Sequence, residues 1–263
     1  MTVHFIGAGP GAADLLTVRA VRLLAASPVC VYAGTYLDTE VLSHCPPDVT
    51  LIDSAGLSLD EITAHLVAAH EAGNDVARLC SGDPSLYSAL AEQARRLDRA
   101  GVPWDVTPGV PAYAAAAAVL RRELTVPELA QTVILTRLRA ASTAMPGSES
   151  LEQLAATGAT LVLHLAIRRT RELAAGLTAS YGPDCPVAVV SRATQPDELV
   201  LRGTLADIGA RVEAAGLRQA AVIIVGPALA AEGFVDSHLY GTRIAQRRSS
   251  GNPITDDGYE CPR

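Results

Sequence analysis

No lysine occurs anywhere in the 263-residue sequence, and all 21 of its basic residues are arginine. Two kinds of chemistry are therefore excluded: a Schiff base between an enzyme amine and a carbonyl substrate, and a covalent anchor for pyridoxal phosphate. The arginine-only pattern fits a GC-rich coding sequence. It also suits a protein that binds carboxylates through bidentate guanidinium groups. The two explanations are compatible, and both stay open.

Other absences limit the compartment and the metal chemistry. The five cysteines form no Cys-x-x-Cys pair, which argues against a disulfide framework and a zinc site and suits a reducing cytoplasm. His65 and His70 are five residues apart, a spacing unsuited to a ligand pair on one helix face. No apolar run reaches the roughly 20 residues of a membrane-spanning helix, and no basic segment precedes an apolar stretch at the start. We therefore expect a soluble cytoplasmic protein without a metal site or a membrane partner.

Composition indicates a folded protein with a sizeable core. Apolar residues make up 49% of the chain and charged residues 19%, which excludes global disorder. The formal net charge of −7 argues against a nucleic-acid partner, since such proteins need a basic surface. The length allows one large domain or two small ones.

Short apolar runs rich in β-branched residues alternate with alanine-rich helical stretches through the first part of the chain. Strands are predicted over residues 3–6, 29–32, 75–80 and 104–107. Helices are predicted over residues 15–26, 59–72, 85–100 and 112–120. Buried strands separated by helices indicate a mostly parallel α/β sheet.

A second α/β series follows a break in this rhythm. Its predicted strands cover residues 132–136, 160–165, 187–192 and 221–225, and its helices cover 151–156, 168–180 and 205–215. A turn at 195–198 lies between two apolar runs and predicts a hairpin. We expect two α/β domains with a ligand cleft between them. The predicted boundaries are 1–120 for the first domain, 121–131 for a linker, 132–240 for the second domain and 241–263 for a polar tail.

The first glycine-rich loop, Gly7 to Ala12, follows a predicted strand and fits the pattern G-x-G-x-x-[GA] of dinucleotide-binding folds. Pro10 removes a backbone N–H where a pyrophosphate needs donors. The second predicted strand ends in Tyr32-Ala33-Gly34, with no acidic residue for a ribose hydroxyl. A tight turn, a nucleoside-like ligand and a nicotinamide dinucleotide all remain possible functions of this loop.

Two further loops lie at predicted strand ends. In Ser81-Gly82-Asp83-Pro84, Asp83 could cap a helix that starts with Pro84, or its carboxylate could bind a ligand. In Pro108 to Pro111, the alanine run that follows could allow close helix packing, or leave space for a flat ligand beside Tyr113. Ligands of open α/β sheets bind at the carboxyl ends of strands, so the three loops together favour a binding site.

Four motifs, in this order, resemble those of the tetrapyrrole (corrin/porphyrin) methylases. They are Gly-Ala-Gly-Pro-Gly at 7–11, Gly-Asp-Pro at 82–84, Pro-Gly-Val before an alanine run at 108–118, and Ala-Thr-x-Pro-Asp-Glu at 193–198. The resemblance covers roughly residues 1–240. It implies two α/β domains of the class III methyltransferase type, usually in a homodimer, with S-adenosylmethionine in the cleft between the domains.

Three shorter segments narrow this resemblance. Gln-Thr-Val-Ile-Leu-Thr-Arg at 131–137, Tyr-Ala-Gly at 32–34 and the stretch 234–240 are similar to members that methylate carbon 11 of precorrin-4 in cobalamin biosynthesis. Alternatives within the family act on the cobalt-containing substrate, on uroporphyrinogen, or, as diphthine synthase, on a protein. The 131–137 string argues against the last two. Outside the family, an NAD-dependent oxidoreductase and a non-catalytic tetrapyrrole carrier remain as alternatives.

The resemblance also implies site residues. The implied cofactor contacts are Pro10, Ser81, Gly82, Asp83, Pro111, Ala112, Leu165, Ala193 and Ala221. Many relatives carry Thr-Ser where this chain has Pro111-Ala112, so only backbone contacts are expected there. Relatives that methylate C2 and C7 often have a glycine in place of Ser81.

Methyl transfer from a sulfonium to an electron-rich carbon needs alignment and exclusion of water more than a dedicated base, so no catalytic residue is named. Precorrin-4 carries many acetate and propionate carboxylates, which arginines at strand ends could bind. The candidates for substrate contacts are Arg78, Tyr113, Arg137, Arg139 and Arg192. For each arginine, an ordinary surface salt bridge remains an equal alternative.

Overall fold

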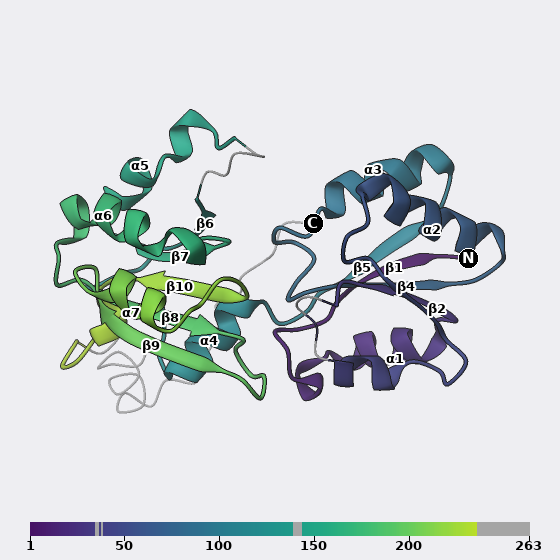
Figure 1. The fold of residues 1–263 in the computed structure, drawn as a ribbon, viewed down its shortest axis with the longest axis horizontal. Coiled ribbons are helices and arrows are strands. Elements are labelled where there is room, and N and C mark those ends of the chain that lie inside the picture. The colour runs from purple at the N-terminus through teal and green to yellow at the C-terminus, as the bar shows by residue number, and fades with distance from the viewer. Residues whose placement is uncertain (35–36, 38, 139–143, 236–263) are drawn as a thin grey trace, which may run out of the picture.

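The computed structural model describes residues 1–34, 37, 39–138 and 144–235, and its ten described strands form two separate five-stranded sheets (Figure 1). The first sheet contains β1 (Val3–Gly7), β2 (Val29–Tyr32), β3 (Thr50–Asp53), β4 (Val76–Cys80) and β5 (Trp104–Thr107). Its order is β3-β2-β4-β1-β5, and every pairing is parallel. We call this sheet and the helices packed on it the N-terminal unit.

Helices cover both faces of the first sheet. Figure 1 shows α1 (Val18–Ala26) on one face and α2 (Leu59–Glu71) and α3 (Leu90–Ala100) on the other. This double cover explains why every residue of β4 is buried, as is typical of the central strand of a parallel sheet. The N-terminus of α2 is closed by a capping box, in which Ser58 and Glu61 satisfy each other's backbone N–H groups.

The second sheet is mixed. It contains β6 (Val133–Arg137), β7 (Thr160–His164), β8 (Pro186–Ser191), β9 (Leu199–Thr204) and β10 (Ala221–Val225). The order is β6-β7-β10-β8-β9, in which only β6 and β7 pair in parallel. Strands β8 and β9 form the hairpin predicted from the turn at 195–198. We call this sheet and its helices the C-terminal unit.

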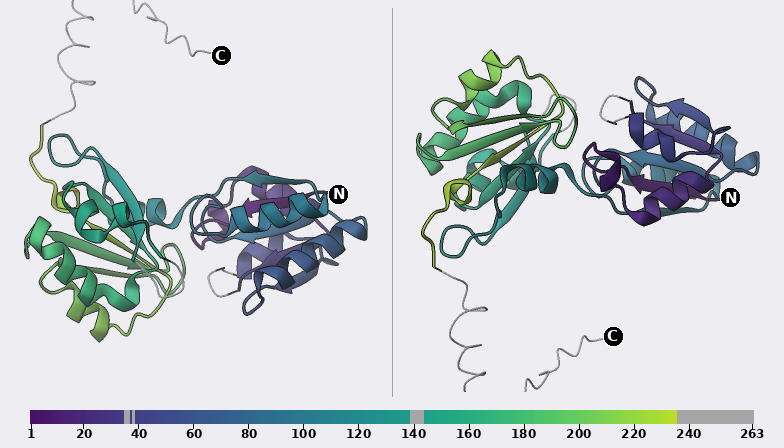
Figure 2. Two further views of the ribbon diagram at one scale, coloured as in Figure 1. Left: turned by 90° about the horizontal axis from the view of Figure 1, so that it is seen from above. Right: turned by 90° about the horizontal axis from the view of Figure 1, so that it is seen from below.

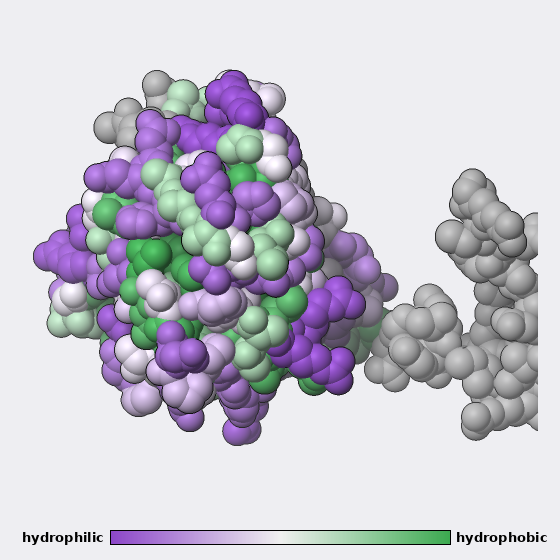
Figure 3. All heavy atoms as spheres, turned by 90° about the vertical axis from the view of Figure 1, so that its right-hand side faces the viewer, coloured by the Kyte–Doolittle hydropathy of each residue, from purple (hydrophilic) through white to green (hydrophobic). Residues whose placement is uncertain are grey.

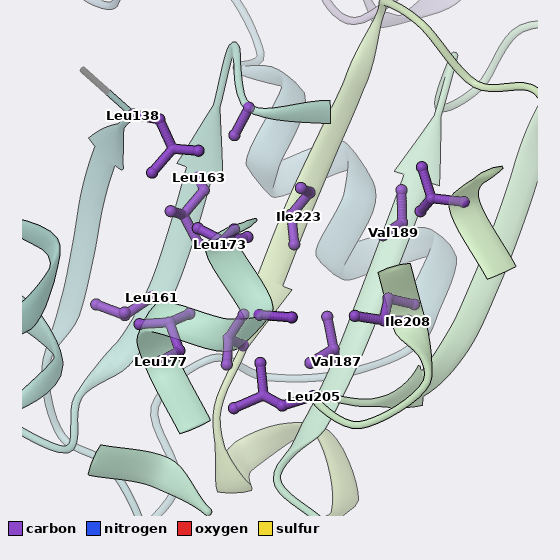
Figure 4. Close-up of a cluster of buried hydrophobic side chains, with 14 of the residues drawn as sticks. Leu138, Leu161, Leu163, Leu173, Leu177, Val187, Val189, Leu205, Ile208 and Ile223 are labelled. Atoms are coloured by element: carbon purple, nitrogen blue, oxygen red, sulfur yellow. The ribbon is translucent and has the colours of Figure 1, made fainter. Parts of the chain in front are cut away.

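One face of the second sheet carries the larger apolar cluster of the C-terminal unit. Helices α5 (Leu151–Ala155), α6 (Thr170–Tyr181) and α7 (Ile208–Ala214) pack there. Figure 4 shows Leu173, Leu177 and Ile208 packed against strand side chains such as Leu163 and Ile223. All five of these side chains are fully or almost fully buried, so this face acts as the hydrophobic core of the unit.

The opposite face of the second sheet is covered by α4 (Ala112–Leu120). This helix falls in the range assigned to the first domain, but Ala115, Ala116 and Leu120 pack against strands β7, β8 and β10. Figure 2 shows α4 beside the C-terminal unit from above and from below. Alanine side chains are small, so the helix axis can approach the sheet closely. Ala115 and Ala116 therefore serve close packing, which is one of the two interpretations of the alanine run.

The segment 121–131, expected to be a linker, is also packed. Leu124 joins the cluster beneath α4, and Val126 and Ala130 pair with each other and pack against Ala228 and Ala231. The boundaries between the two predicted domains stay a prediction, but the segments around residue 120 pack with the second sheet. Residues 241–263, the predicted polar tail, lie outside the described residues.

Two elements differ most from the sequence-based expectation. Strand β3 was not predicted, because it is an edge strand whose side chains are mostly exposed and give little apolar signal. Helix α3 begins at Leu90 rather than at residue 85, because Tyr87 and Ala89 both adopt left-handed backbone conformations before it.

The end of the N-terminal unit has an ordinary mixed surface. Figure 3 shows hydrophilic side chains interspersed with smaller apolar areas on this face. More than half of the accessible surface of a typical folded protein comes from apolar atoms, so such a mixture needs no special explanation. In the part of the chain that the structure describes, no helix combines the length and apolar character needed to cross a membrane.

Candidate functional site

The three glycine-bearing loops meet at the carboxyl edge of the first sheet. They follow β1, β4 and β5, which are adjacent in the order β4-β1-β5. Gly9 and Gly82 pair as a short bridge, with N···O distances of 3.1 Å and 2.8 Å. The expectation that these loops gather at one sheet edge is confirmed.

Glycine is required at this junction because three backbones come together. A Cβ atom on Gly7 would overlap the backbone of Gly109, and a Cβ on Gly109 would overlap the carbonyl oxygen of Gly82. Gly82 also has a φ of +67°, a conformation that favours glycine. The junction brings the three loops together at the edge of the first sheet, where Gly82 lines a cavity.

A cavity of about 500 Å³ lies between this edge and the second sheet. Residues of both units line it, and its wall is more apolar than polar. The wall includes every residue that the family resemblance implied for the cofactor: Pro10, Ser81, Gly82, Asp83, Pro111, Ala112, Leu165, Ala193 and Ala221. The structure thus brings together residues more than 200 positions apart in the sequence. Their role as cofactor contacts stays a prediction.

Asp83 does not cap α3, since that helix begins only at Leu90. Its carboxylate instead accepts hydrogen bonds from the backbone N–H groups of Gly109 and Ser85, each at 2.8 Å, and from the Ser85 hydroxyl. Burial acts to raise the pKa of this carboxyl, but the hydrogen bonds outweigh burial and hold the pKa below its usual value. Asp83 therefore lines the cavity as a carboxylate while joining two of the three loops.

The structure argues against two of the proposed substrate contacts. Arg78 is only 7% exposed, and its guanidinium donates to the side chains of Gln93 (3.0 Å) and Ser54 (3.2 Å) inside the N-terminal unit. Arg78 is the middle residue of β4 rather than its end, and its side chain turns into the core. Tyr113 packs in the apolar layer between α4 and the second sheet, and it is not among the residues that line the cavity.

The remaining three candidates have different positions. Arg192 lines the cavity and forms an ion pair with Asp197 at 3.1 Å. Arg137 ends the edge strand β6, and its guanidinium donates to the backbone carbonyls of Leu138 and Ala144, each at 3.3 Å. Arg139 lies outside the described residues.

Three arginines that were not proposed also line the cavity. Arg168 and Arg169 lie in the short helix Ile167–Arg169 that follows the end of β7, so the strand-end argument could have identified them. Arg218 lies before β10, where that argument does not apply. Because β10 is antiparallel to β7, the start of β10 lies at the same edge as the end of β7. Antiparallel pairing, which the sequence did not reveal there, therefore adds Arg218 to the site.

An aromatic contact crosses the cavity between the units. Tyr87, from the loop after β4, lies 5.6 Å from His164 of β7, measured between ring centroids. The Nε2 atom of His164 is buried and finds no hydrogen-bond partner among the residues that the structure describes. Burial lowers the pKa of this imidazole, which favours its neutral form. Sequence reasoning missed both residues, since neither belongs to a recognised motif.

Backbone strain is concentrated in the cavity wall. Tyr87, Leu165, Arg192 and Ala220 line it and have φ values of +53°, +54°, +47° and +53°. Such conformations are costly for residues other than glycine and tend to cluster where function requires a particular geometry. The cavity is therefore the best candidate for the functional site.

The strand order distinguishes this site from a dinucleotide-binding one. In the common dinucleotide-binding sheet, the first strand lies next to the second. Here β4 lies between β1 and β2, so the first glycine loop contacts the loops after β4 and β5 instead. Together with Pro10, this topology argues against the nicotinamide dinucleotide alternative.

Comparison with known proteins agrees with this arrangement. The sequence model of the family described as Tetrapyrrole (Corrin/Porphyrin) Methylases matches residues 2–209. The chain belongs to this family. The match covers most of the chain and confirms the resemblance drawn from the four motifs.

Individual methylases give finer comparisons. A Rhodococcus erythropolis protein named precorrin-4 C(11)-methyltransferase is 60% identical over 240 residues, which cover 91% of this chain and 96% of that protein. The solved structure of a cobalt precorrin-4 methyltransferase is 36% identical, covers 87% of this chain and 95% of its own, and has a TM-score of 0.83. A uroporphyrin-III C-methyltransferase from Thermus thermophilus, solved with S-adenosylhomocysteine, is 28% identical with a TM-score of 0.74, over 87% of this chain and 93% of its own. The two-unit α/β fold of this methylase is thereby confirmed.

Proposed function

We propose that this methylase transfers a methyl group from S-adenosylmethionine to carbon 11 of precorrin-4. The observation that carries the proposal is that all nine implied cofactor residues, which come from both units, line one cavity. The name of the Rhodococcus relative supports carbon 11 as the position methylated. The identity of 60% to that relative, against 36% to the cobalt precorrin-4 enzyme, favours the cobalt-free substrate.

The cavity fits S-adenosylmethionine in size and character. Its volume of about 500 Å³ lies in the usual range of small-molecule sites, which is roughly 300–1,000 Å³. Ala112, Ala193 and Ala221 are small, so the wall can accept a flat base and a ribose between the two units. Asp83 supplies a carboxylate, which suits a ligand with hydroxyl groups and a positive charge. The residues present therefore fit the group.

When bound, the cofactor supplies an electrophilic methyl group on a sulfonium, and the departing thioether keeps the electron pair of the broken bond. The role of the protein is to align the reactants and exclude water. Leu86, Tyr87 and Leu165 contribute apolar surface to the cavity wall. No residue is assigned as a catalytic base.

Arginines on the C-terminal wall suit an anionic macrocycle. Arg168, Arg192 and Arg218 line the cavity, so positive charge is concentrated there in a chain of net charge −7. The Nε atom of Arg168 donates to the carbonyl of Arg218 at 2.9 Å, which holds these two residues together. We assign them, with Arg192, to the carboxylates of the substrate, because guanidinium groups bind carboxylates through two hydrogen bonds at once.

A methyl-transfer assay tests the proposed activity. The protein is incubated with labelled S-adenosylmethionine and precorrin-4, and in a parallel reaction with the cobalt-containing substrate. We expect one labelled methyl per macrocycle at carbon 11, and faster transfer to precorrin-4. Faster transfer to the cobalt form would replace the proposed substrate, and no transfer to either would contradict the proposal.

Cofactor binding is tested separately by thermal unfolding. S-adenosylhomocysteine should raise the melting temperature, because a ligand that binds only the folded state stabilises it. A shift with NAD and none with S-adenosylhomocysteine would reverse the assignment. The homodimer expected from the family and the cytoplasmic location expected from the cysteine pattern stay predictions, and light scattering of the purified protein tests the dimer.

A further inference from the structure

The loop between β8 and β9 contacts the first glycine loop across the two units. The backbone N–H of Ala12 donates to the Thr194 hydroxyl at 3.1 Å, and the Gln195 side-chain amide donates to the carbonyl of Pro10 at 3.2 Å. The partners are 182 and 185 residues apart in the sequence. These two hydrogen bonds directly join the N-terminal and C-terminal units.

The contacts lie at the cavity itself, since Pro10, Arg192 and Gln195 all line it. Arg192 donates to the Gln195 oxygen at 3.3 Å, which leaves the amide nitrogen of Gln195 facing Pro10. Pro10 has no backbone N–H, but its carbonyl accepts this hydrogen bond. Arg192 of the C-terminal unit therefore orients the Gln195 amide toward Pro10 of the N-terminal unit.

Contacts within residues 192–198 fix the conformation of this loop independently of the glycine loop. The backbone N–H of Thr194 donates to Glu198 at 2.7 Å, and Arg192 pairs with Asp197 at 3.1 Å. Arg192 and Thr194 have positive φ values of +47° and +68°, so the loop is held in a strained conformation. Strain of this kind persists only where surrounding contacts fix it.

Gly11 gives an independent indication of how close the two loops are. A Cβ atom on Gly11 would overlap the Cγ atom of Gln195, and its next nearest neighbours are also atoms of that side chain. The absence of a side chain at position 11 therefore has a local reason beyond turn formation: it admits Gln195 to the glycine loop.

We propose that Thr194 and Gln195 act as positioning residues that clasp the glycine loop and so set the separation of the two cavity walls. The clasp holds Pro10 on one wall opposite Ala193 and Ala221 on the other. Its loss lets the walls move apart and weakens a ligand that must touch both. The inference deepens the proposed function, because it concerns the site at which S-adenosylmethionine is proposed to bind.

The first test compares two substitutions of one residue by titration with S-adenosylhomocysteine. Gln195→Ala removes the hydrogen bonds of this side chain to the Pro10 carbonyl and to Arg192. Only the bond to Pro10 joins the two units, so the dissociation constant should rise about 3- to 10-fold, as expected for one net hydrogen bond. Gln195→Glu keeps the size and the oxygen facing Arg192, but it has no donor for the Pro10 carbonyl. It should weaken binding about as much as Gln195→Ala. Wild-type affinity in Gln195→Glu would overturn the clasp.

Thr194 offers a matched rescue. Thr194→Val removes the acceptor for the Ala12 N–H and should weaken binding, whereas Thr194→Ser keeps the hydroxyl and should restore it. Gln131→Ala is the control, because Gln131 is exposed and precedes β6 away from the cavity wall. A loss of melting temperature with unchanged affinity in the folded protein would show a structural role only, and would overturn the proposal.

A double-mutant cycle tests the geometry without relying on any single variant. Gly11→Ala alone should weaken binding strongly, because its Cβ displaces Gln195. In the Gln195→Ala background the overlapping atoms are gone, so Gly11→Ala should cost at least 3-fold less in affinity. Additive effects would contradict the contact. If the wild-type protein itself does not bind S-adenosylhomocysteine, the proposed function fails; if it binds and the cycle is additive, only the clasp fails.

Discussion

The two sheets contribute to one cavity in different ways. The first sheet is wholly parallel, and it presents only strand carboxyl ends at the site, followed by glycine-bearing loops. The second sheet is mixed, so ends of β7 and β8 and the start of β10 lie at the same edge. The first unit thus supplies close backbone approach and one carboxylate, whereas the second supplies arginines, a histidine and small apolar side chains. Parallel topology concentrates loops of one kind, while antiparallel pairing mixes loops from both strand ends.

The largest effect should come from the glycine junction of the first unit. Gly7→Ala would push its Cβ into the backbone of Gly109, so the loops after β1 and β5 would have to separate. We expect a loss of about 2–3 kcal/mol in unfolding free energy, together with loss of S-adenosylhomocysteine binding. Gly147→Ala is the control, because nothing lies near its added Cβ. Denaturant unfolding of both variants measures the difference, and equal stability would show that the junction tolerates a side chain.

The arginines of the second unit should affect the substrate without affecting the cofactor. Arg168→Gln and Arg218→Gln each remove a charged donor, and such hydrogen bonds contribute about 1.5–3 kcal/mol. The Michaelis constant for the macrocycle should therefore rise about 10-fold or more per residue, and the affinity for S-adenosylhomocysteine should stay the same.

Arg78→Gln should behave in the opposite way, because Arg78 is buried among Gln93 and Ser54 in the first unit. We expect reduced stability and an unchanged Michaelis constant for the folded fraction. Steady-state kinetics beside thermal unfolding separates the two behaviours. A raised Michaelis constant for Arg78→Gln with normal stability would restore Arg78 to the substrate site.

Asp83→Asn should give an intermediate effect. Asparagine has one oxygen, so it cannot accept from both Gly109 and Ser85 as the carboxylate does. We expect a stability loss of about 1–2 kcal/mol and weaker S-adenosylhomocysteine binding, as measured by thermal unfolding with and without ligand. If Asp83 served only as a helix cap, the change would be nearly silent, because asparagine caps about as well as aspartate.

The smallest effect should be the pH dependence contributed by His164. Its pKa is lowered by burial in the folded protein, so the unfolded chain binds the proton more readily. Stability should therefore be complete above the unfolded pKa of about 6.5 and fall as the pH drops below it. His164→Gln should show a shallower decline between pH 7 and pH 5 in denaturant titrations. Parallel curves for both proteins would show that the imidazole is not buried in solution.

Most of the helices and strands could be predicted from the sequence, since their apolar periodicity is strong. Strands β2, β5 and β10 lie at the predicted residues, and β8–β9 forms the predicted hairpin. Edge strand β3 was missed, because periodicity reports burial and this strand has little. The start of α3 was placed too early, because Asp83-Pro84 satisfies the rules for a helix start without forming one there.

The sequence by itself determined the family and the glycine loops, because a strand followed by a loop that needs glycine leaves a local signature. It could not decide which side chains reach the cavity. Arg78 lies in the middle of β4 and turns into the core, whereas Arg168 lies after the end of β7 and lines the site. The packing of α4 on the second sheet and the antiparallel direction of β10 were also decided only in three dimensions. Direction, packing partner and side-chain face depend on contacts between distant segments, and those contacts exist only once the chain has folded.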